Sequence, residues 1–261
     1  MKKAVFFDLD DTLLDDRKSI QTAFDVTCGE LSEKYEKDAA EIEKHVRTAA
    51  HAQYQTYDFY PVTLSIGINP FEGLWGNFGD VHHNGFRSMG DQIADYQLKA
   101  WENGLEQAGI PASEAEWARE RFRNVRRKSA FVYEETFDVL NTLRDKGIRL
   151  LLLTNGAPSL QLEKLTMTPE LVPYFEHVLI SGHFGFGKPE KAIFDHALRL
   201  MDLEPGDVLM VGDNQGTDIL GATRTGIESA WINHGGEGKI VEGANPVHTL
   251  SRLKDILSLI E

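Results

Sequence analysis

Ala4-Val5-Phe6-Phe7-Asp8-Leu9-Asp10-Asp11-Thr12 is a continuous apolar run that ends in a cluster of carboxylates. An unbroken run of this kind is typical of a strand that is buried on both faces of a parallel sheet. Four similar runs follow, at residues 148–153, 178–180, 208–211 and 229–232. The segments between these four runs have helical periodicity. Such an alternation of strands and helices predicts an α/β fold with a parallel sheet.

A long helical stretch interrupts the alternation after the first strand. It contains no convincing buried strand, and four of its segments have helical character: residues 17–35, 38–54, 89–108 and 114–128. Ser113 stands where it can cap the last of these helices. We therefore expect residues 16–131 to be a mainly helical insertion, and residues 1–15 and 132–261 to form the core with the sheet. A final amphipathic helix is expected over residues 250–260.

Residues 54–90 have little periodicity and are rich in aromatic residues, Gly and Asn. Long segments of this kind are often functional. Two interpretations stay open. The segment is either an element of substrate specificity or subunit contact, or a folded loop that packs its own aromatic side chains. For Trp75 and Phe78 we favour packing.

The composition is that of an ordinary globular protein with a strongly acidic balance. Among the 261 residues, 27 are Lys or Arg and 41 are Asp or Glu, which gives a formal net charge of −14. A chain this acidic repels nucleic acid and anionic membranes at long range, so we expect neither a nucleic-acid polymer nor a membrane as a partner. The oligomeric state stays open.

The single cysteine, Cys28, cannot form an internal disulfide, and we expect it to be a structural thiol in a reducing environment. The first apolar run has only four residues, which is too short for the core of a signal peptide. No stretch is apolar over the length that a bilayer requires. The expected location is the cytoplasm.

Polar clusters follow the predicted strands. They are Asp8-Leu9-Asp10-Asp11-Thr12, Thr154-Asn155-Gly156, Gly187-Lys188-Pro189-Glu190 and Gly212-Asp213-Asn214-Gln215-Gly216-Thr217-Asp218. In an open parallel sheet, ligands bind at the carboxyl ends of the strands. We therefore expect the four clusters to meet at one edge of the sheet.

The residue types in these clusters suit a phosphoryl group. Three crowded acids, Asp8, Asp10 and Asp213, need a cation, and their hard oxygen ligands favour Mg²⁺. Thr154 offers a hydroxyl donor, and Asn155 with the residue after it offers amides. Lys188 supplies a mobile positive charge that can meet a phosphoryl oxygen and a carboxylate together.

The four clusters, in this order, resemble the motifs of the haloacid dehalogenase superfamily. Asp8-Leu9-Asp10-Asp11-Thr12 is similar to its first motif, Thr154 to its second, Lys188 to its third, and Gly212-Asp213 with Asp218 to its fourth. The resemblance implies a Rossmann-like core, and the helical insertion resembles the family's C1-type cap. The form of the first motif resembles the phosphatase branch, which has pyrimidine nucleotidase and N-acylneuraminate-9-phosphatase members. Asp11 stands where Gly is frequent in the family.

The resemblance implies a phosphatase that works through an aspartyl-phosphate. Asp8 attacks phosphorus, and Asp10 protonates the leaving oxygen and then activates water. The dehalogenases lack an aspartate at the position of Asp10, so its presence favours phosphoryl transfer from a small phosphorylated metabolite.

The resemblance also assigns the binding groups. It implies that Mg²⁺ is held by the Asp8 carboxylate, the Asp10 main-chain carbonyl and the Asp213 carboxylate. Asp218 supports the waters of the metal or the lysine, without binding the metal itself. The residues that hold the phosphoryl group are Thr154, Asn155 and Lys188.

Three alternatives stay open at this point. They are a phosphomutase on the same core, a catalytically silent protein that binds a phosphorylated ligand, and a phosphonate hydrolase that uses a lysine of the insertion. Asp8 and Asp10 are both present, which argues against the silent binder.

Other charged residues receive a structural interpretation. Arg119, Arg123 and Arg127 share one helix face, and we expect this face to be solvated and to compensate nearby acids. His82 and His83 are adjacent, which rarely suits two ligands of one ion, and we expect them to be loop residues.

Overall fold

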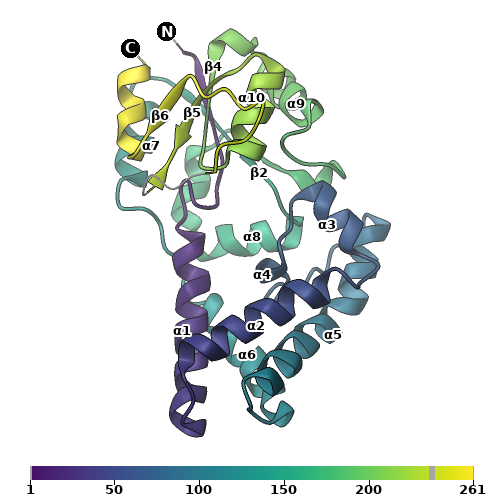
Figure 1. Ribbon diagram of the computed structural model, residues 1–261. Helices are drawn as coiled ribbons and strands as arrows, with labels where there is room; N and C mark the ends of the chain where they lie inside the picture. Colours follow the sequence, from purple (N-terminus) through teal and green to yellow (C-terminus); the bar gives the residue numbers. More distant parts are fainter. Residues whose placement is uncertain (1, 235–238, 261) are drawn as a thin grey trace. The chain divides into compact units, whose positions relative to one another are not determined.

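The computed structural model describes residues 2–234 and 239–260, and these form two compact units (Figure 1). Unit 1 comprises Met1–Asp15, Val132–Gly156 and Thr168–Glu261. Unit 2 comprises Asp16–Phe131 and Ala157–Met167. Each unit has its own hydrophobic core.

Unit 1 is built on a parallel sheet whose described part has six strands. The strands are β1 (Ala4–Phe7), β2 (Arg149–Thr154), β3 (His177–Ile180), β4 (Val208–Gly212), β5 (Glu228–Ile232) and β6 (His248–Leu250). Their order in the sheet is β3-β2-β1-β4-β5-β6, and every pair is parallel. The predicted α/β fold with a parallel sheet is therefore confirmed.

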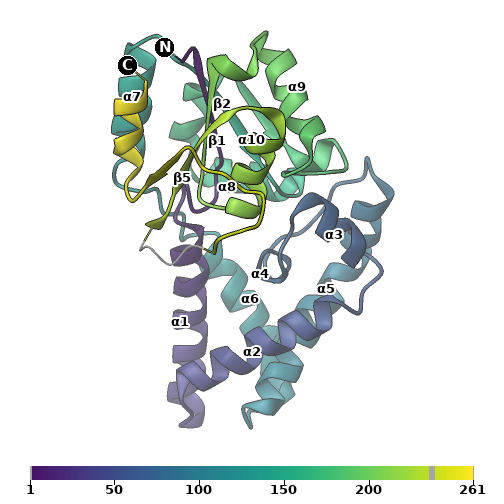
Figure 2. The same cartoon turned by 45° about the horizontal axis from the view of Figure 1, so that its top comes forward.

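Helices cover both faces of this sheet. One face packs on α9 (Lys191–Met201) and α10 (Leu220–Thr225), and α7 (Thr136–Asp145) lies on the other side with the 3₁₀ helix η7 (Leu253–Leu259) (Figure 2). The shorter elements of the unit are the 3₁₀ helices η2 (Pro169–Tyr174), η3 (Ser181–His183) and η4 (Pro205–Asp207), and one turn of π-helix, η5 (Gln215–Ile219). Cover on both faces explains why the strands are apolar without alternation.

The C-terminal end differs from the expectation of one helix over residues 250–260. Leu250 instead ends β6, and the helical part is the 3₁₀ helix Leu253–Leu259. β6 is three residues long and not fully buried, so it has none of the continuous apolar character that identified the other strands.

Unit 2 is helical. Its elements are α1 (Asp16–Tyr35), α2 (Ala39–Tyr54), α3 (Tyr60–Ile66), α4 (Pro70–Gly73), α5 (Asn84–Gln107), η1 (Ala112–Glu114), α6 (Ala115–Arg126) and α8 (Pro158–Met167). The expected cap at Ser113 is wrong, because Ser113 lies inside the 3₁₀ turn η1 and α6 has no side-chain cap. Cys28 is buried in this unit, and burial raises the pKa of its thiol to about 12.

The segment 54–90 packs its own aromatic side chains. Five of its rings are fully buried in the core of unit 2, those of Tyr54, Phe59, Trp75, Phe78 and Phe86. The Tyr54 ring lies 5.0 Å from that of Tyr96 on α5, centroid to centroid. These contacts favour the interpretation of this segment as a folded loop, and Trp75 and Phe78 are packing residues.

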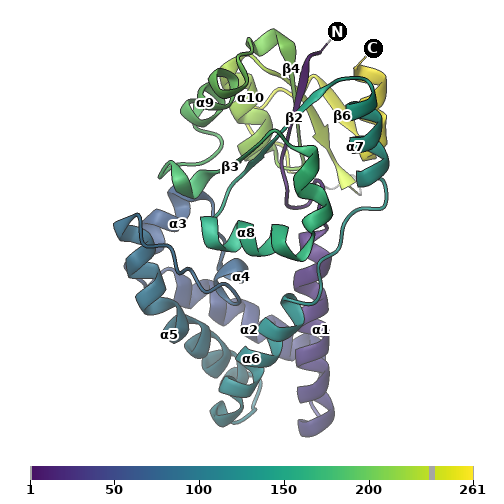
Figure 3. The ribbon, with the colours of Figure 1, turned by 180° about the vertical axis from the view of Figure 1, so that it is seen from behind.

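Helix α8 belongs to the helical unit, although its residues lie in the range that we expected to form the core. Ser159 donates from its main-chain N and its hydroxyl to the carboxylate of Asp80, at 2.9 and 2.5 Å. Lys164 on the same helix forms a buried ion pair of 3.0 Å with Glu72 of α4, and α8 and α4 lie close together in Figure 3. These long-range pairs cannot be read from a local pattern.

No helix in the described ranges is both long and apolar enough to cross a membrane.

A close approach of α5 to α2 gives a test of the packing in unit 2. A Cβ atom at Gly104 would lie 2.5 Å from the Cα of Val46, so the two helix backbones would have to separate. We expect Gly104→Ala to lower the free energy of unfolding by about 1–3 kcal/mol, measured by urea denaturation. Gly29→Ala on α1 is the matched control. A Cβ there meets nothing within 4 Å, and the substitution should stabilise by about 0.5–1 kcal/mol. A destabilisation of equal size at both positions would contradict this account.

Candidate active site

The candidate functional side chains lie where the central strands of unit 1 end. Asp8 directly follows β1, Thr154 is the last residue of β2, and Asp213 directly follows β4. β1 lies between β2 and β4 in the sheet, so three of the polar clusters start from neighbouring strands. The main-chain N of Asp8 donates to the carbonyl of Val211 at 2.9 Å, which fixes the ends of β1 and β4 to each other.

The ammonium of Lys188 is the centre of the site. It is buried and lies 2.7 Å from an oxygen of Asp8 and 2.6 Å from an oxygen of Asp218. It also donates to the carbonyl of Leu153 at 2.8 Å. Burial opposes the charged form of Lys188, but Asp218 and Asp8 outweigh it and raise the pKa of the lysine. The residue is therefore a fixed cation.

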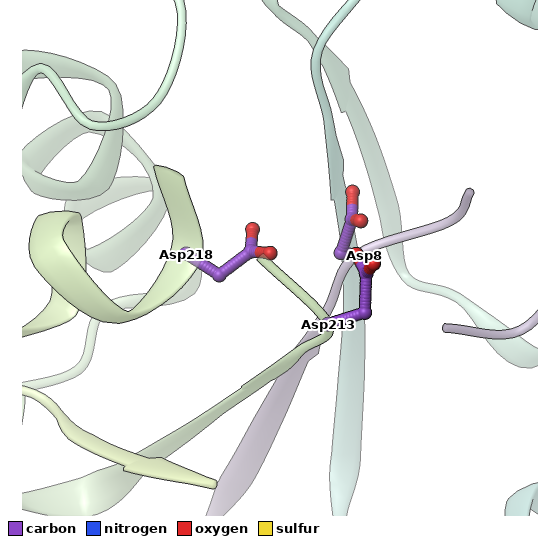
Figure 4. A group of neighbouring side chains, drawn as sticks. All are labelled: Asp8, Asp213 and Asp218. Carbon is purple, nitrogen blue, oxygen red and sulfur yellow. The ribbon is translucent and has the colours of Figure 1, made fainter. Parts of the chain in front are cut away.

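Three carboxylates lie close together at this site. One oxygen from each of Asp8, Asp213 and Asp218 lies within 4.8 Å of the other two, and Figure 4 shows Asp218 directed at the pair from the turn after β4. Burial is the largest cause that raises the pKa of Asp8, from its ordinary value of 3.8 to about 6; Lys188 opposes the shift and Asp218 adds to it.

This donor set fits a hard divalent cation. With all three acids ionised, Lys188 compensates only one of their charges, so the group keeps an excess of negative charge in a largely buried place. Carboxylate oxygens are the ligands that Mg²⁺ prefers.

Asp218 is fully buried, and both of its oxygens have partners. One oxygen pairs with Lys188, and the other accepts from the main-chain N of Asn214 at 3.1 Å. Gly212 is required beside it, because a Cβ there would lie 2.3 Å from the Asp218 carboxyl group. This arrangement suits a residue that orients the lysine and the loop after β4.

Two supporting residues of the site were missed by the sequence reasoning. The indole N–H of Trp231, at the end of β5, donates to the carbonyl of Asp213 at 2.7 Å. The Asn214 side chain accepts from the main-chain N of Gly216 at 2.8 Å. Both hold the loop that carries Asp213. Asn214, two residues before Gly216, was a local signal for a turn, but no signal marked Trp231.

Thr154 and Asn155 lie at the end of β2. Thr154 is fully buried. The side-chain amide of Asn155 forms two hydrogen bonds with the main chain of Lys188, at 2.8 and 3.0 Å. The site therefore brings the second and third clusters together, with the side chain of Asn155 between them.

The first cluster folds as a tight loop. Asp10 forms a bridge with Leu14, and Leu14 pairs with Val132. Asp11 has a φ of 58°, in the left-handed region that Gly adopts most easily and Asp tolerates better than most residues. This conformation is the physical reason why Gly suits the position and Asp can replace it.

The basic helix face and the two histidines have structural roles in unit 2. Arg119 and Arg123 pair with Glu120, at 3.0 and 2.6 Å. Arg127 pairs with Glu163 at 2.7 Å. His83 accepts from the main-chain N of Gly85 at the start of α5, and His82 and His83 both lie in the preceding loop. The expectation that this face compensates nearby acids is confirmed, but the expectation that it is solvated is wrong, because the side chains of Arg119 and Arg123 are only 15% and 14% exposed.

A family profile described as haloacid dehalogenase-like hydrolase matches residues 2–226. The chain belongs to this family. It is 34% identical over 235 residues to a phosphoserine phosphatase of Thermus thermophilus, with 89% of each chain covered. It is 27% identical to the N-acylneuraminate-9-phosphatase of Mus musculus, with 99% of this chain and 94% of the relative covered. These relatives are named as phosphatases, which are hydrolases of phosphoric monoester bonds.

Solved structures agree with the fold of this haloacid dehalogenase-like hydrolase. The putative hydrolase YfnB of Bacillus subtilis aligns with a TM-score of 0.67 at 18% identity, and the alignment covers 100% of this chain and 99% of that one. At this identity the likeness supports the shared fold.

The raised pKa of Asp8 predicts that the stability of the metal-free protein depends on pH. The pKa is higher in the folded state, so stability is lost as the pH rises from about 4 through about 6. We expect Asp8→Asn, with chelator present, to stabilise the protein by about 1–3 kcal/mol at pH 7 and by much less at pH 4. Thermal unfolding across this pH range measures the difference.

Asp25→Asn is the control for this experiment, because Asp25 is an exposed carboxylate on α1. Its effect should stay within about 0.5 kcal/mol at every pH. An Asp8→Asn protein that is less stable than the wild type at pH 7 would contradict the assignment of a buried, costly charge.

Proposed function

We propose that this protein is a magnesium-dependent phosphatase that hydrolyses a small phosphomonoester through an aspartyl-phosphate on Asp8. The observation that carries the proposal is the group formed by Asp8, Lys188, Asp213 and Asp218, of which all but Asp213 are buried, with Asp10 two residues beyond Asp8. A nucleophilic carboxylate, a fixed cation and a divalent-metal donor set together suit phosphoryl transfer. The phosphatase relatives support the same reaction class.

The reaction proceeds in two displacements. In the first, a carboxylate oxygen of Asp8 forms a bond to phosphorus while the bond to the leaving oxygen breaks, and Asp10 gives its proton to that oxygen. In the second, Asp10 takes a proton from water. The water oxygen bonds to phosphorus, the bond to Asp8 breaks, and phosphate and free Asp8 are released.

The remaining residues hold the phosphoryl group and the metal. The Thr154 hydroxyl, the Lys188 ammonium and the main-chain N–H of Asn155 donate hydrogen bonds to the phosphoryl oxygens. Asp8, Asp213 and the Asp10 main-chain carbonyl are the groups that would hold Mg²⁺. When bound, the metal neutralises the charge of the phosphoryl group and of the carboxylates around it.

The helical unit selects the substrate in this proposal and acts as the cap of the family. Its aromatic core and internal ion pairs make it a stable body that can carry specificity residues. The two named relatives differ in their substrates, phosphoserine and N-acylneuraminate 9-phosphate, so a substrate panel must include both.

The purified protein should release phosphate from 4-nitrophenyl phosphate and from at least one member of a panel that contains phosphoserine, N-acylneuraminate 9-phosphate and a nucleoside monophosphate. Asp8→Asn should lower kcat by at least about 1,000-fold, because an amide cannot act as the nucleophile. Asp10→Ala should lower kcat by about 100- to 10,000-fold with a smaller change in KM. Released phosphate, measured colorimetrically, is the readout.

Substantial turnover by Asp8→Asn would exclude the aspartyl-phosphate. Equal effects of Asp10→Ala on kcat and on binding would make Asp10 a binding residue. Phosphate that returns to the substrate rather than to water would identify a phosphomutase.

Metal dependence is tested without turnover. A magnesium concentration 100-fold above its dissociation constant should stabilise the folded protein by about 2.7 kcal/mol, measured by thermal unfolding. Asp213→Asn should remove most of this stabilisation, whereas Asp195→Asn on α9 should keep it. Equal stabilisation of all three proteins would argue against a metal at this site.

A further inference from the structure

Both the N and the O of the Asn155 side-chain amide form hydrogen bonds with the main chain of Lys188. Its amide N donates to the Lys188 carbonyl at 3.0 Å, and its amide O accepts from the Lys188 N–H at 2.8 Å. The two residues are 33 positions apart in the sequence. Two opposed hydrogen bonds fix both the position and the orientation of the Lys188 backbone, as the paired bonds of a β-ladder do.

The other end of Lys188 is held by the same strand end. Its ammonium donates to the carbonyl of Leu153 at 2.8 Å, two residues before Asn155. Lys188 is therefore fastened at its backbone and at its charge to the segment that carries Thr154. These bonds fix the position of the Lys188 ammonium relative to the Thr154 hydroxyl, although Thr154 ends β2 and Lys188 lies in the segment after β3.

A second set of hydrogen bonds joins the end of β2 to η3, the 3₁₀ helix after β3. The hydroxyl of Ser181 accepts from the main-chain N of Gly156 at 2.9 Å, and Gly182 N donates to the Gly156 carbonyl at 3.1 Å. Ser181 is fully buried. These bonds hold the end of β2 in place, so the position of Asn155 determines the position of the Lys188 backbone.

We infer that Asn155 is a positioning residue that acts through Lys188 and does not contact the phosphoryl group with its side chain. This inference rests on the proposed phosphatase function, and it makes the expectation that Asn155 holds the phosphoryl group more specific, because it excludes the side chain from that contact. The main-chain N–H of Asn155 is not affected by it.

The kinetic consequence follows from the role of the lysine. A displacement of about 1 Å in a group that stabilises the transition state costs about 100-fold in rate. Asn155→Ala should therefore lower kcat for 4-nitrophenyl phosphate by about 10- to 100-fold, with KM within about threefold. Asn155→Asp should behave in the same way, because its carboxylate has no donor for the Lys188 carbonyl. Asn141→Ala is the matched control, since Asn141 has side-chain hydrogen bonds in unit 1, to Tyr174 and Arg144.

A double-mutant cycle separates positioning from direct contact. The dissociation constant of orthovanadate, a mimic of the transferring phosphoryl group, is measured calorimetrically with Mg²⁺ for wild type, Asn155→Ala, Lys188→Ala and the double variant. We expect Asn155→Ala to weaken vanadate binding by about tenfold when Lys188 is present, and by less than about twofold when it is made in the Lys188→Ala variant. Thermal unfolding of the four proteins verifies that each is folded.

Each outcome decides the question. Effects that multiply in the double variant, or a rise in KM without a fall in kcat, would overturn the inference in favour of direct phosphate contact. Unchanged kinetics in Asn155→Ala and Asn155→Asp would overturn it as well. If Lys188→Ala binds no vanadate, the split between kcat and KM in the two Asn155 variants decides. A wild-type protein that neither hydrolyses aryl phosphate nor binds vanadate would instead refute the proposed function.

Discussion

The buried ammonium of Lys188 is the interaction on which the site depends. Two carboxylates, Asp8 and Asp218, lie within 2.7 Å of it, and without this cation their burial side by side would cost several kcal/mol. Asp8 directly follows β1, Asp218 lies in η5 after β4, and the lysine comes from the segment after β3. The strand order β3-β2-β1-β4 is what brings these three parts of the chain to one edge. The strand order of the sheet therefore brings together the charges that compensate one another.

Most of unit 1 was predictable because its strands are buried on both faces. Such strands have continuous apolar runs, and five of the six described strands were located in this way. The edge strand β6 has too few buried residues to give that signal. Helix α7 was not singled out, although Val139, Leu140 and Leu143 have helical spacing and are buried, so its signal was present in the sequence.

The site was predictable to the extent that it depends on the ends of strands. Asp8, Thr154 and Asp213 follow from that rule, because chain order and strand polarity place them at one edge. The hydrogen-bond partners that hold these residues in place do not follow from that rule. The bond from Trp231 to the Asp213 carbonyl and the paired bonds between Asn155 and Lys188 join residues 18 and 33 positions apart. Such contacts depend on how loops pack, and no local pattern specifies them.

The assignment of α8 to the helical unit changes how that unit is connected to the site. An insertion after the first strand alone would be joined to the core by two chain crossings. Because Gly156 belongs to unit 1 and Ala157 to unit 2, the end of β2 continues directly into a helix that Asp80, Glu72 and Arg127 hold to the helical unit. Four crossings therefore join the units, and two of them directly follow the loops that carry Asp8 and Thr154. The hydrogen bonds of Asn155 to Lys188, and of Gly156 to Ser181, hold the end of β2 to the rest of unit 1 directly before the chain enters α8.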